Sequence, residues 1–210
     1  MKTAALFDLD GVVIDTEPSY TEFWGMIGRK YFPQNECFAE SIKGQTLTYI
    51  LDHSFPGDIK CQSEVKKLLN EHQSTMSYPL IDGVLDFVDR LRAMGVCVAV
   101  VTSSDSAKMD HLYQAHPGFK ERFDRIFTAE DVLRSKPAPD CYISAAKYFG
   151  LDAKDCVVFE DSFNGLKSGR ASGARVVGLS TSNPESSIAE YCDLVVADFS
   201  QPEALLKLFV

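Results

Sequence analysis

The sequence has no long hydrophobic run, and it is short of positive charge. None of its apolar stretches approaches the roughly 20 residues that a membrane-spanning helix requires, so we expect no membrane association. Its 21 Lys and Arg stand against 30 Asp and Glu, which gives a formal charge of −9 at pH 7. Because nucleic-acid phosphates are bound mainly by Lys and Arg, this balance argues against a nucleic-acid partner. A phosphorylated small molecule is not excluded, since a bound cation can supply the missing positive charge.

Cysteine and histidine are also sparse, and neither is arranged as a metal site. The cysteines are dispersed, with no CxxC pair and no histidine at zinc-finger spacing: Cys37, Cys61, Cys97, Cys141, Cys156 and Cys192. All six are predicted to be reduced thiols that act as small buried apolar residues. Ordinary surface or packing roles are expected for the four histidines: His53, His72, His111 and His116. The apolar run before Asp8 is too short for a signal-peptide core, so a cytoplasmic protein is predicted.

The apolar residues form two kinds of pattern along the chain, short continuous runs and amphipathic helical repeats. With 210 residues, 45% of them hydrophobic and 24% charged, the chain can form a soluble globular core with a smaller insert. Short apolar runs typical of buried strands lie at 3–7, 96–101, 125–128, 156–159, 175–179 and 194–196. Amphipathic helical patterns lie between or after these runs, at 84–91, 142–149 and 204–208. This alternation predicts an α/β fold, a doubly wound and mainly parallel Rossmann-like sheet with helices on both faces.

The link between the first two predicted strands is far longer than a parallel crossover requires. Thr16, followed by Glu17 and Pro18, is typical of a helix start in which Thr16 is the capping residue. Apolar side chains at helical spacing follow in two groups: Tyr20, Phe23, Trp24, Ile27 and Tyr31, then Val65, Leu68, Leu69, His72 and Met76. We therefore expect an inserted all-helical cap at 16–78 and a core domain made of 1–15 and 79–210. The aromatic residues Tyr20, Trp24 and Tyr31 are expected to pack inside the cap rather than contact a ligand.

Polar side chains follow four of the predicted strands, at the edge where doubly wound sheets bind their ligands. In chain order they are Asp8 and Asp10, then Thr102, Ser103 and Ser104, then Lys136, and finally Glu160 and Asp161. Carboxylates that converge in this way repel one another unless a cation intervenes. An oxygen-rich site without sulfur or imidazole suits Mg²⁺, which favours carboxylates, water and phosphate oxygens. A lysine and a hydroxyl complete what a transferring phosphoryl group needs, namely neutralisation and fixed donors.

Four short motifs, in this order and spacing, resemble those of the haloacid dehalogenase superfamily over the whole chain. They are Asp8-Leu9-Asp10-Gly11-Val12-Val13, Thr102, Lys136-Pro137 and Glu160-Asp161-Ser162. The helical insert resembles the capped branch that includes β-phosphoglucomutase and many sugar-phosphate phosphatases. Dehalogenating members have no Asp at the position of Asp10, so phosphoryl transfer is the activity implied.

The resemblance also implies a role for each residue of these motifs. Asp8 would attack phosphorus and form a covalent aspartyl-phosphate, and Asp10 would act as general acid and then as general base. Thr102 and Lys136 would hold the phosphoryl oxygens. The Mg²⁺ ligands would be Asp8, Asp161 and the backbone carbonyl of Asp10, with Glu160 reaching the ion directly or through water. Similar phosphatases often have the peptide bond before Pro137 in the cis form, so a cis Lys136–Pro137 bond is predicted.

The acceptor of the phosphoryl group is either water or a second position on a sugar. A mutase of the resembling branch carries a histidine where this chain has Tyr20, and a cap arginine where it has Leu47. Residues 17–79 hold six Lys and Arg against eight Asp and Glu, which makes a poor surface for a second phosphate. Water is therefore the predicted acceptor, and the phosphosugar mutase is the alternative. Substrate contacts are predicted for Thr16, Lys43, Gly44, Gln45, Ser103 and Ser104.

A signalling receiver domain is a more distant alternative. Such a domain also combines an acceptor aspartate, acidic metal ligands, a Thr and a Lys on a parallel sheet. Its phosphorylated aspartate ends a middle strand, however, and it has no large cap, whereas here the paired acids close the first predicted strand. The sequence thus favours a Mg²⁺-dependent phosphatase for a small phosphorylated metabolite, with a sugar phosphate as the first choice. The sequence does not indicate the oligomeric state, and a monomer is the default expectation.

Overall fold

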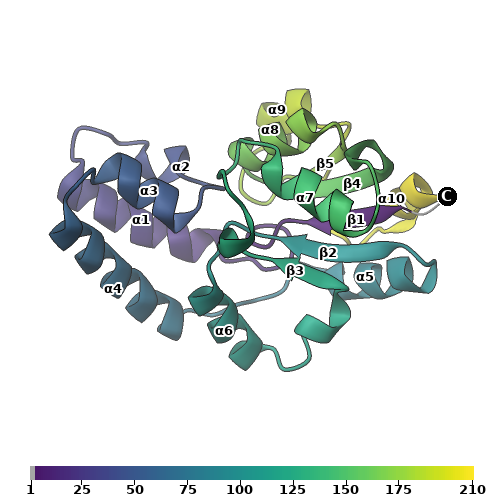
Figure 1. The fold of residues 1–210 in the computed structure, drawn as a ribbon, viewed down its shortest axis with the longest axis horizontal. Helices are drawn as coiled ribbons and strands as arrows, with labels where there is room; N and C mark the ends of the chain where they lie inside the picture. Colours follow the sequence, from purple (N-terminus) through teal and green to yellow (C-terminus); the bar gives the residue numbers. More distant parts are fainter. Residues whose placement is uncertain (1–2) are drawn as a thin grey trace.

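The structure is a computed structural model, and it describes residues 3–210. Six strands of this segment form a single parallel sheet in the order β3-β2-β1-β4-β5-β6 (Figure 1). Their bounds are β1 Ala4–Phe7, β2 Cys97–Val101, β3 Arg125–Phe127, β4 Cys156–Glu160, β5 Arg175–Leu179 and β6 Leu194–Val196. Each begins and ends within one residue of its predicted run. The predicted doubly wound α/β sheet is therefore confirmed.

The side chains of the central strands alternate between two hydrophobic cores, one on each face of the sheet. Phe7 of β1 packs with Phe87 and Val100 in the first core, while its neighbour Leu6 packs with Tyr142 in the second. The first core is covered by α5 (Val84–Ala93), α6 (Ser106–Ala115) and α10 (Glu203–Leu206). The second is covered by α7 (Asp140–Tyr148), α8 (Phe163–Ser172) and α9 (Glu185–Ile188), which lie on the opposite side of the sheet in Figure 1. Burial on both faces explains why the strands are almost purely apolar.

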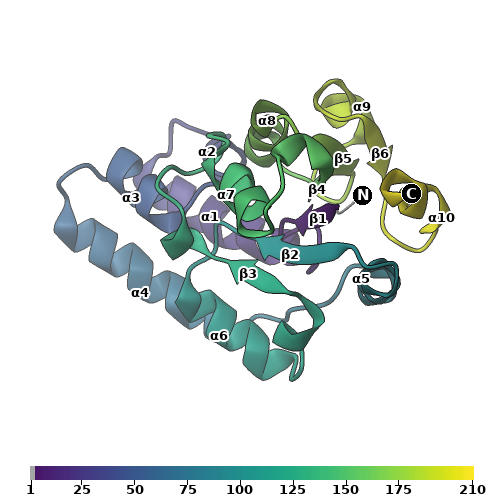
Figure 2. The ribbon, with the colours of Figure 1, turned by 45° about the vertical axis from the view of Figure 1, so that its right-hand side comes forward.

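Four helices lie together beside one end of the sheet, in the segment where a cap was predicted, and we refer to them as the cap (Figures 1 and 2). Their bounds are α1 Glu17–Tyr31, α2 Phe38–Ser41, α3 Leu47–Ser54 and α4 Ile59–Thr75. Their inward side chains form a third hydrophobic cluster, in which Phe23 and Ile27 of α1 meet Val65 and Leu69 of α4. Tyr78, at the predicted end of the cap, packs instead in the first core of the sheet domain. The chain thus returns to the core slightly before residue 79.

The remaining regular structure consists of single turns of 3-10 helix. They are η1 Lys120–Arg122, η2 Ala129–Asp131, η3 Ala153–Asp155, η4 Ala189–Tyr191 and η5 Lys207–Phe209. Among the described residues, no helix combines the length and the apolar character needed to cross a membrane.

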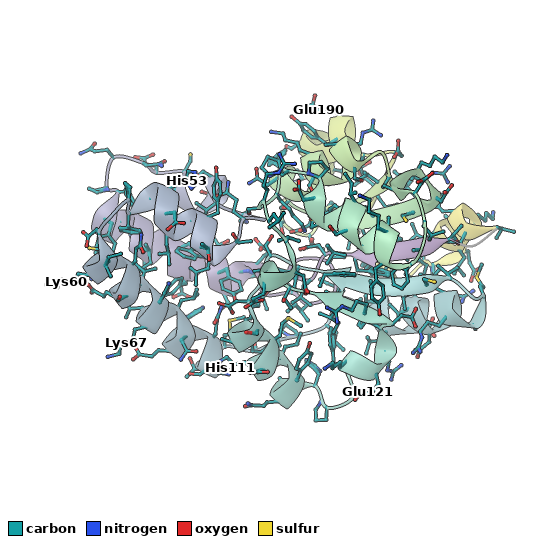
Figure 3. All side chains as sticks on the ribbon, viewed as in Figure 1. His53, Lys60, Lys67, His111, Glu121 and Glu190 are labelled. Atoms are coloured by element: carbon teal, nitrogen blue, oxygen red, sulfur yellow. The ribbon has the colours of Figure 1, made fainter. Side chains whose placement is uncertain are left out.

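One local prediction is confirmed in position only, and another is wrong. Thr16 is the N-cap residue of α1, as predicted, but its side chain makes no capping hydrogen bond, and its hydroxyl donates to the carboxylate of Asp10. Of the cysteines, only Cys141 and Cys156 are buried, whereas Cys37 is exposed and the other three are half-buried. The histidines do take surface and packing positions, and Figure 3 shows His53 and His111 at the periphery of the molecule.

Candidate active site

Asp8 lies at the centre of the site, directly beyond β1, and 7% of its surface is exposed. Its backbone N–H donates to the carbonyl of Phe159 on the neighbouring strand β4, which fixes its position at the sheet edge. Gly11 then turns the chain with a φ of 72°. A Cβ at Gly11 would lie 2.1 Å from an oxygen of Asp161, so a side chain there would displace the acidic group. The requirement for glycine after Asp10 thus comes from the close approach of the two acidic segments.

Lys136 contacts Asp8 from the loop that follows η2. Its Nζ lies 2.6 Å from Oδ1 of Asp8, 2.6 Å from Oε1 of Glu160 and 3.2 Å from the carbonyl oxygen of Val101. Only 2% of this lysine is exposed. Burial acts to lower the pKa of its ammonium, but the carboxylates of Asp8 and Glu160 hold that pKa well above its ordinary value. The Lys136–Pro137 bond is cis, as predicted.

Glu160 supports Lys136 from the end of β4 and is fully buried. Its Oε1 also accepts the hydroxyl of Tyr142 at 2.8 Å. Its Oε2 accepts the backbone N–H groups of Asp161 and Ser162 and the hydroxyl of Ser162, at 3.1, 3.3 and 3.2 Å. Both oxygens are thus already engaged by donors of the protein. This arrangement makes Glu160 a holder of Lys136 as well as a member of the acidic cluster.

Asp161 follows Glu160 and is 1% exposed. One oxygen each of Asp8, Glu160 and Asp161 lie within 4.8 Å of one another. Burial raises the pKa of Asp161 well above its ordinary value, and the carboxylates of Glu160, Glu17 and Asp8 add to this rise. Burial likewise raises the pKa of Asp8 to about 7, although Lys136 counteracts it. One buried lysine therefore leaves this cluster short of positive charge, and an all-oxygen donor set of this kind fits Mg²⁺.

Asp10 lies beside the cluster, and its side chain is held by three donors. Its Oδ1 accepts the hydroxyl of Thr16 and the ammonium of Lys108, and its Oδ2 accepts the hydroxyl of Ser104 at 3.0 Å. Thr102 is 3% exposed, and its hydroxyl accepts the backbone N–H of Ser104 at 3.0 Å. The predicted residues of the first, second and fourth motifs thus surround Asp8 at one edge of the sheet.

A cavity that is open to solvent separates this edge from the cap. Its core wall includes Asp8, Asp10, Thr102, Ser103, Ser104, Lys108 and Asp161. Its cap wall includes Glu17, Tyr20, Trp24, Ile42, Lys43, Gly44, Gln45, Leu47, Ile50 and Leu69. Tyr20 and Trp24 therefore line the cavity as well as packing in the cap, which the sequence did not lead us to expect.

Three hydrogen bonds join the core to the cap loop at 43–46. Ser103 donates to the carbonyl of Gly44 at 2.9 Å, Asn164 donates to that of Lys43 at 2.7 Å, and the N–H of Thr46 donates to the Ser135 hydroxyl at 2.8 Å. The loop that was predicted to contact substrate therefore lies at the cavity. Thr16 is the exception among the predicted substrate contacts, because it is fully buried and does not line the cavity.

Several residues of the site were missed in the sequence. Lys108 lies in the first turn of α6, whose N-cap Asp105 accepts the backbone N–H of Lys108 at 3.0 Å. A helix that starts just after β2 must begin at the catalytic edge of the sheet. This position in the sequence could have indicated that Lys108 lies at the site. Ser182 and Asn183 follow β5, and they donate to the side chain and backbone of Asp161. Tyr142 could not be identified from the sequence, because its spacing is that of the other apolar residues of α7.

The sequence pattern of the haloacid dehalogenase-like hydrolases matches residues 2–173. The chain therefore belongs to this hydrolase family. It is 30% identical over 178 residues to the fructose-1-phosphate phosphatase YqaB of Escherichia coli, which covers 83% of this chain and 94% of that protein. A further curated relative, from Arabidopsis thaliana, is much longer, and this chain spans 53% of its length.

Solved structures agree with this assignment at the level of the fold. A HAD hydrolase of family IA, variant 3, from Entamoeba histolytica has a TM-score of 0.81 at 24% identity, over 100% of this chain and 99% of that one. The β-phosphoglucomutase of Clostridium difficile has a TM-score of 0.78 at 20% identity, over 100% of this chain and 97% of that one. The predicted family is confirmed by the match over residues 2–173, and these structures share the fold of this chain.

Proposed function

We propose that this protein is a Mg²⁺-dependent phosphatase that hydrolyses a small phosphorylated metabolite through an aspartyl-phosphate on Asp8. The observation that carries the proposal is the environment of Asp8. Its carboxylate lines the cavity, contacts the ammonium of Lys136 at 2.6 Å and lies within 4.8 Å of oxygens of Asp161 and Glu160. A carboxylate placed in this way can attack phosphorus while its neighbours offset the charge of the phosphoryl group.

The other residues of the site bind the phosphoryl oxygens or transfer protons. Lys136 and the hydroxyl of Thr102 bind the phosphoryl oxygens, and Glu160 holds Lys136 in place through its 2.6 Å contact. Asp10 gives a proton to the leaving oxygen as the P–O bond breaks, and then accepts a proton from the water that attacks the aspartyl-phosphate. A single side chain can serve both steps because the leaving group and the water occupy the same side of the phosphorus atom in turn.

Asp8, Asp161 and the backbone carbonyl of Asp10 would hold the cation, as the resemblance to the family implies. When bound there, Mg²⁺ would neutralise the acidic cluster and the phosphoryl oxygens. The oxygens of Glu160 are occupied by protein donors, so we assign this residue to the support of Lys136 and of any water beside the ion. This assignment narrows the sequence prediction, in which Glu160 could reach the ion directly.

Water is the acceptor in this proposal, and the cap wall supports that choice. The Nζ of Lys43 pairs with an oxygen of Glu17 at 2.8 Å, and both side chains are more than four-fifths buried. The one basic group of the cap loop is therefore already neutralised. Leu47 lines the cavity where a mutase of this branch carries an arginine. A sugar bisphosphate, which a mutase must retain and turn around, would find no free cation among the described residues of this cap wall.

A sugar phosphate is the first candidate for the substrate, as in the similar fructose-1-phosphate phosphatase of E. coli. We propose a monomer acting in the cytoplasm on soluble metabolites, with no nucleic-acid or membrane partner. The acidic composition argues against a nucleic-acid partner, because nucleic-acid phosphates are bound mainly by Lys and Arg.

The test is phosphate release from a panel of sugar phosphates, nucleotides and p-nitrophenyl phosphate, with Mg²⁺ and with a chelator. We expect turnover that requires the cation. In parallel, β-glucose 1-phosphate with a trace of the 1,6-bisphosphate should yield phosphate without rapid formation of glucose 6-phosphate. Glucose 6-phosphate forming much faster than phosphate would favour the mutase. A stable phosphoprotein without turnover would favour a receiver domain.

A further inference from the structure

We propose that Lys108 is a positioning residue that orients the Asp10 carboxyl group for proton transfer to the leaving oxygen. The inference rests on the proposed phosphatase function, and it assigns a role to a lysine that none of the four motifs contains. Lys108 comes from the first turn of α6, six residues beyond Thr102. It lines the catalytic cavity, yet only 2% of the residue is exposed.

The ammonium of Lys108 has two partners, one from the core and one from the cap. It forms an ion pair with Oδ1 of Asp10. It also lies 4.4 Å from the centre of the Tyr20 ring, a distance at which the face of an aromatic ring attracts a cation. The ring is itself fixed, because the Tyr20 hydroxyl accepts the amide of Gln73 at 3.0 Å. A buried ammonium is costly unless it is paired, so these contacts define a single position for it.

The donors around Asp10 differ between its two oxygens. Oδ1 accepts from both Lys108 and Thr16, whereas Oδ2 accepts only from Ser104. The fully occupied oxygen is Oδ1, so Oδ2 is the atom left to carry the exchanged proton. When the P–O bond breaks, its electron pair goes to the leaving oxygen, and that oxygen takes the proton from Oδ2. Asp10 becomes a carboxylate beside the ammonium of Lys108, which stabilises the charge that this transfer creates.

The other two lysines of the site cannot replace Lys108 in this role. The ammonium of Lys136 is shared between Asp8 and Glu160. That of Lys43 is paired with Glu17 on the cap. Lys108 is thus the single lysine of the described cavity lining that contacts Asp10, and its loss would leave Oδ1 with the Thr16 hydroxyl alone.

The experiment compares two substrates of similar size that differ in their need for an acid. Benzyl phosphate releases a poor alkoxide leaving group, whereas p-nitrophenyl phosphate releases a stable phenolate that needs little protonation. We measure kcat/KM for both with wild-type enzyme and with Lys108→Met, because this constant reports on the step that releases the leaving group. The ratio of the two constants in one preparation does not depend on how much of the enzyme is correctly folded.

The expected result is a loss of about 10²-fold for benzyl phosphate and of less than about tenfold for p-nitrophenyl phosphate, the size that general acid catalysis implies. An equal loss for both substrates would overturn the inference, since a merely structural lysine would affect both alike. If Lys108→Met yields no soluble protein, Lys108→Gln is measured in the same way, with the same two outcomes.

Lys43→Met is the matched control, because it removes the other lysine of the cavity lining without touching Asp10. It should leave the ratio of the two constants unchanged. A fall in the ratio comparable to that of Lys108→Met would show a general effect of charge and would overturn the specific assignment. Failure of the wild-type enzyme to hydrolyse either ester would reject the phosphatase proposal itself, and the role of Lys108 with it.

Discussion

The core wall of the active-site cavity holds its charges in direct contact, whereas the cap wall is mostly apolar. On the core wall, Asp8 meets a buried lysine and Asp10 meets another. On the cap wall, Tyr20, Trp24, Ile42, Leu47, Ile50 and Leu69 surround one internal ion pair, between Lys43 and Glu17. The difference indicates that the chemistry resides in the core, while the cap excludes water and shapes the space for the organic part of the substrate.

The largest effect should come from the core wall. The substitution Asp8→Asn removes the nucleophilic carboxylate but nearly keeps the shape of the side chain. We therefore expect kcat to fall by about 10⁴-fold or more while the fold stays intact. Steady-state rates measure the fall in kcat, and circular dichroism measures whether the fold is intact. Asp15→Asn is the control, because Asp15 is exposed and makes only a backbone contact near the site. Activity of Asp8→Asn close to that of the wild type would mean that the core wall is not where the chemistry occurs.

A second effect concerns the acidic cluster without a cation. Burial raises the pKa of Asp8 from 3.8 to about 7 in the folded protein. A carboxyl group whose pKa is raised by folding favours the fold below its unfolded pKa and loses that contribution as the pH rises through the folded value. In the presence of a chelator, Tm should therefore fall between about pH 4 and pH 7, by roughly 2–4 °C for each kcal/mol lost.

The same titration in Asp8→Asn removes this contribution, together with the part that the Asp8 carboxylate plays in raising the pKa of Asp161. The wild type should show the steeper fall in Tm. Mg²⁺ should raise the Tm of the wild type more at about pH 8 than at about pH 5, because protons compete with the cation for the carboxylates. Identical slopes for the two proteins would count against a strained, cation-requiring cluster.

The smallest effect should come from the cap wall. Leu47→Arg places a cation where the cavity lining is now half-buried and apolar. The KM for a sugar bisphosphate should fall by about tenfold, which corresponds to one charge-assisted contact of roughly 1.4 kcal/mol. The KM for p-nitrophenyl phosphate should stay within about twofold. Leu47→Gln, which adds polarity without charge, is the control. An equal fall in the KM for the bisphosphate in this variant would contradict the explanation by charge.

The same contrast explains what the sequence could predict. The strands were found to within one residue because burial on both faces leaves uninterrupted apolar runs, as at Val98–Val101 in β2. The acidic motifs were found because strand ends in a parallel sheet meet at one edge. The cis form of the Lys136–Pro137 bond also agreed with expectation.

Contacts between distant segments could not be predicted in this way. Lys108 reads as a surface lysine of a helix, and only the approach of α6 to the first acidic loop and of Tyr20 from the cap buries it. Thr16 is the N-cap residue that the sequence predicts, but the bond that its hydroxyl donates to the Asp10 carboxylate joins two segments and could not be read from the local pattern. The aromatic residues of α1 serve the cap core and the cavity at once, and helical spacing alone does not separate these two uses.

The central claim is that the phosphoryl group passes through Asp8. It is tested most directly by mixing the enzyme with p-nitrophenyl phosphate and Mg²⁺, quenching in acid within the first turnover, and mapping the added mass by peptide sequencing in a mass spectrometer. Our account predicts one phosphoryl group on the peptide that contains Asp8, localised to that residue, and its loss at the rate at which phosphate appears. Rapid turnover with no phosphorylated Asp8 at any time, or with the group on another residue, would contradict it.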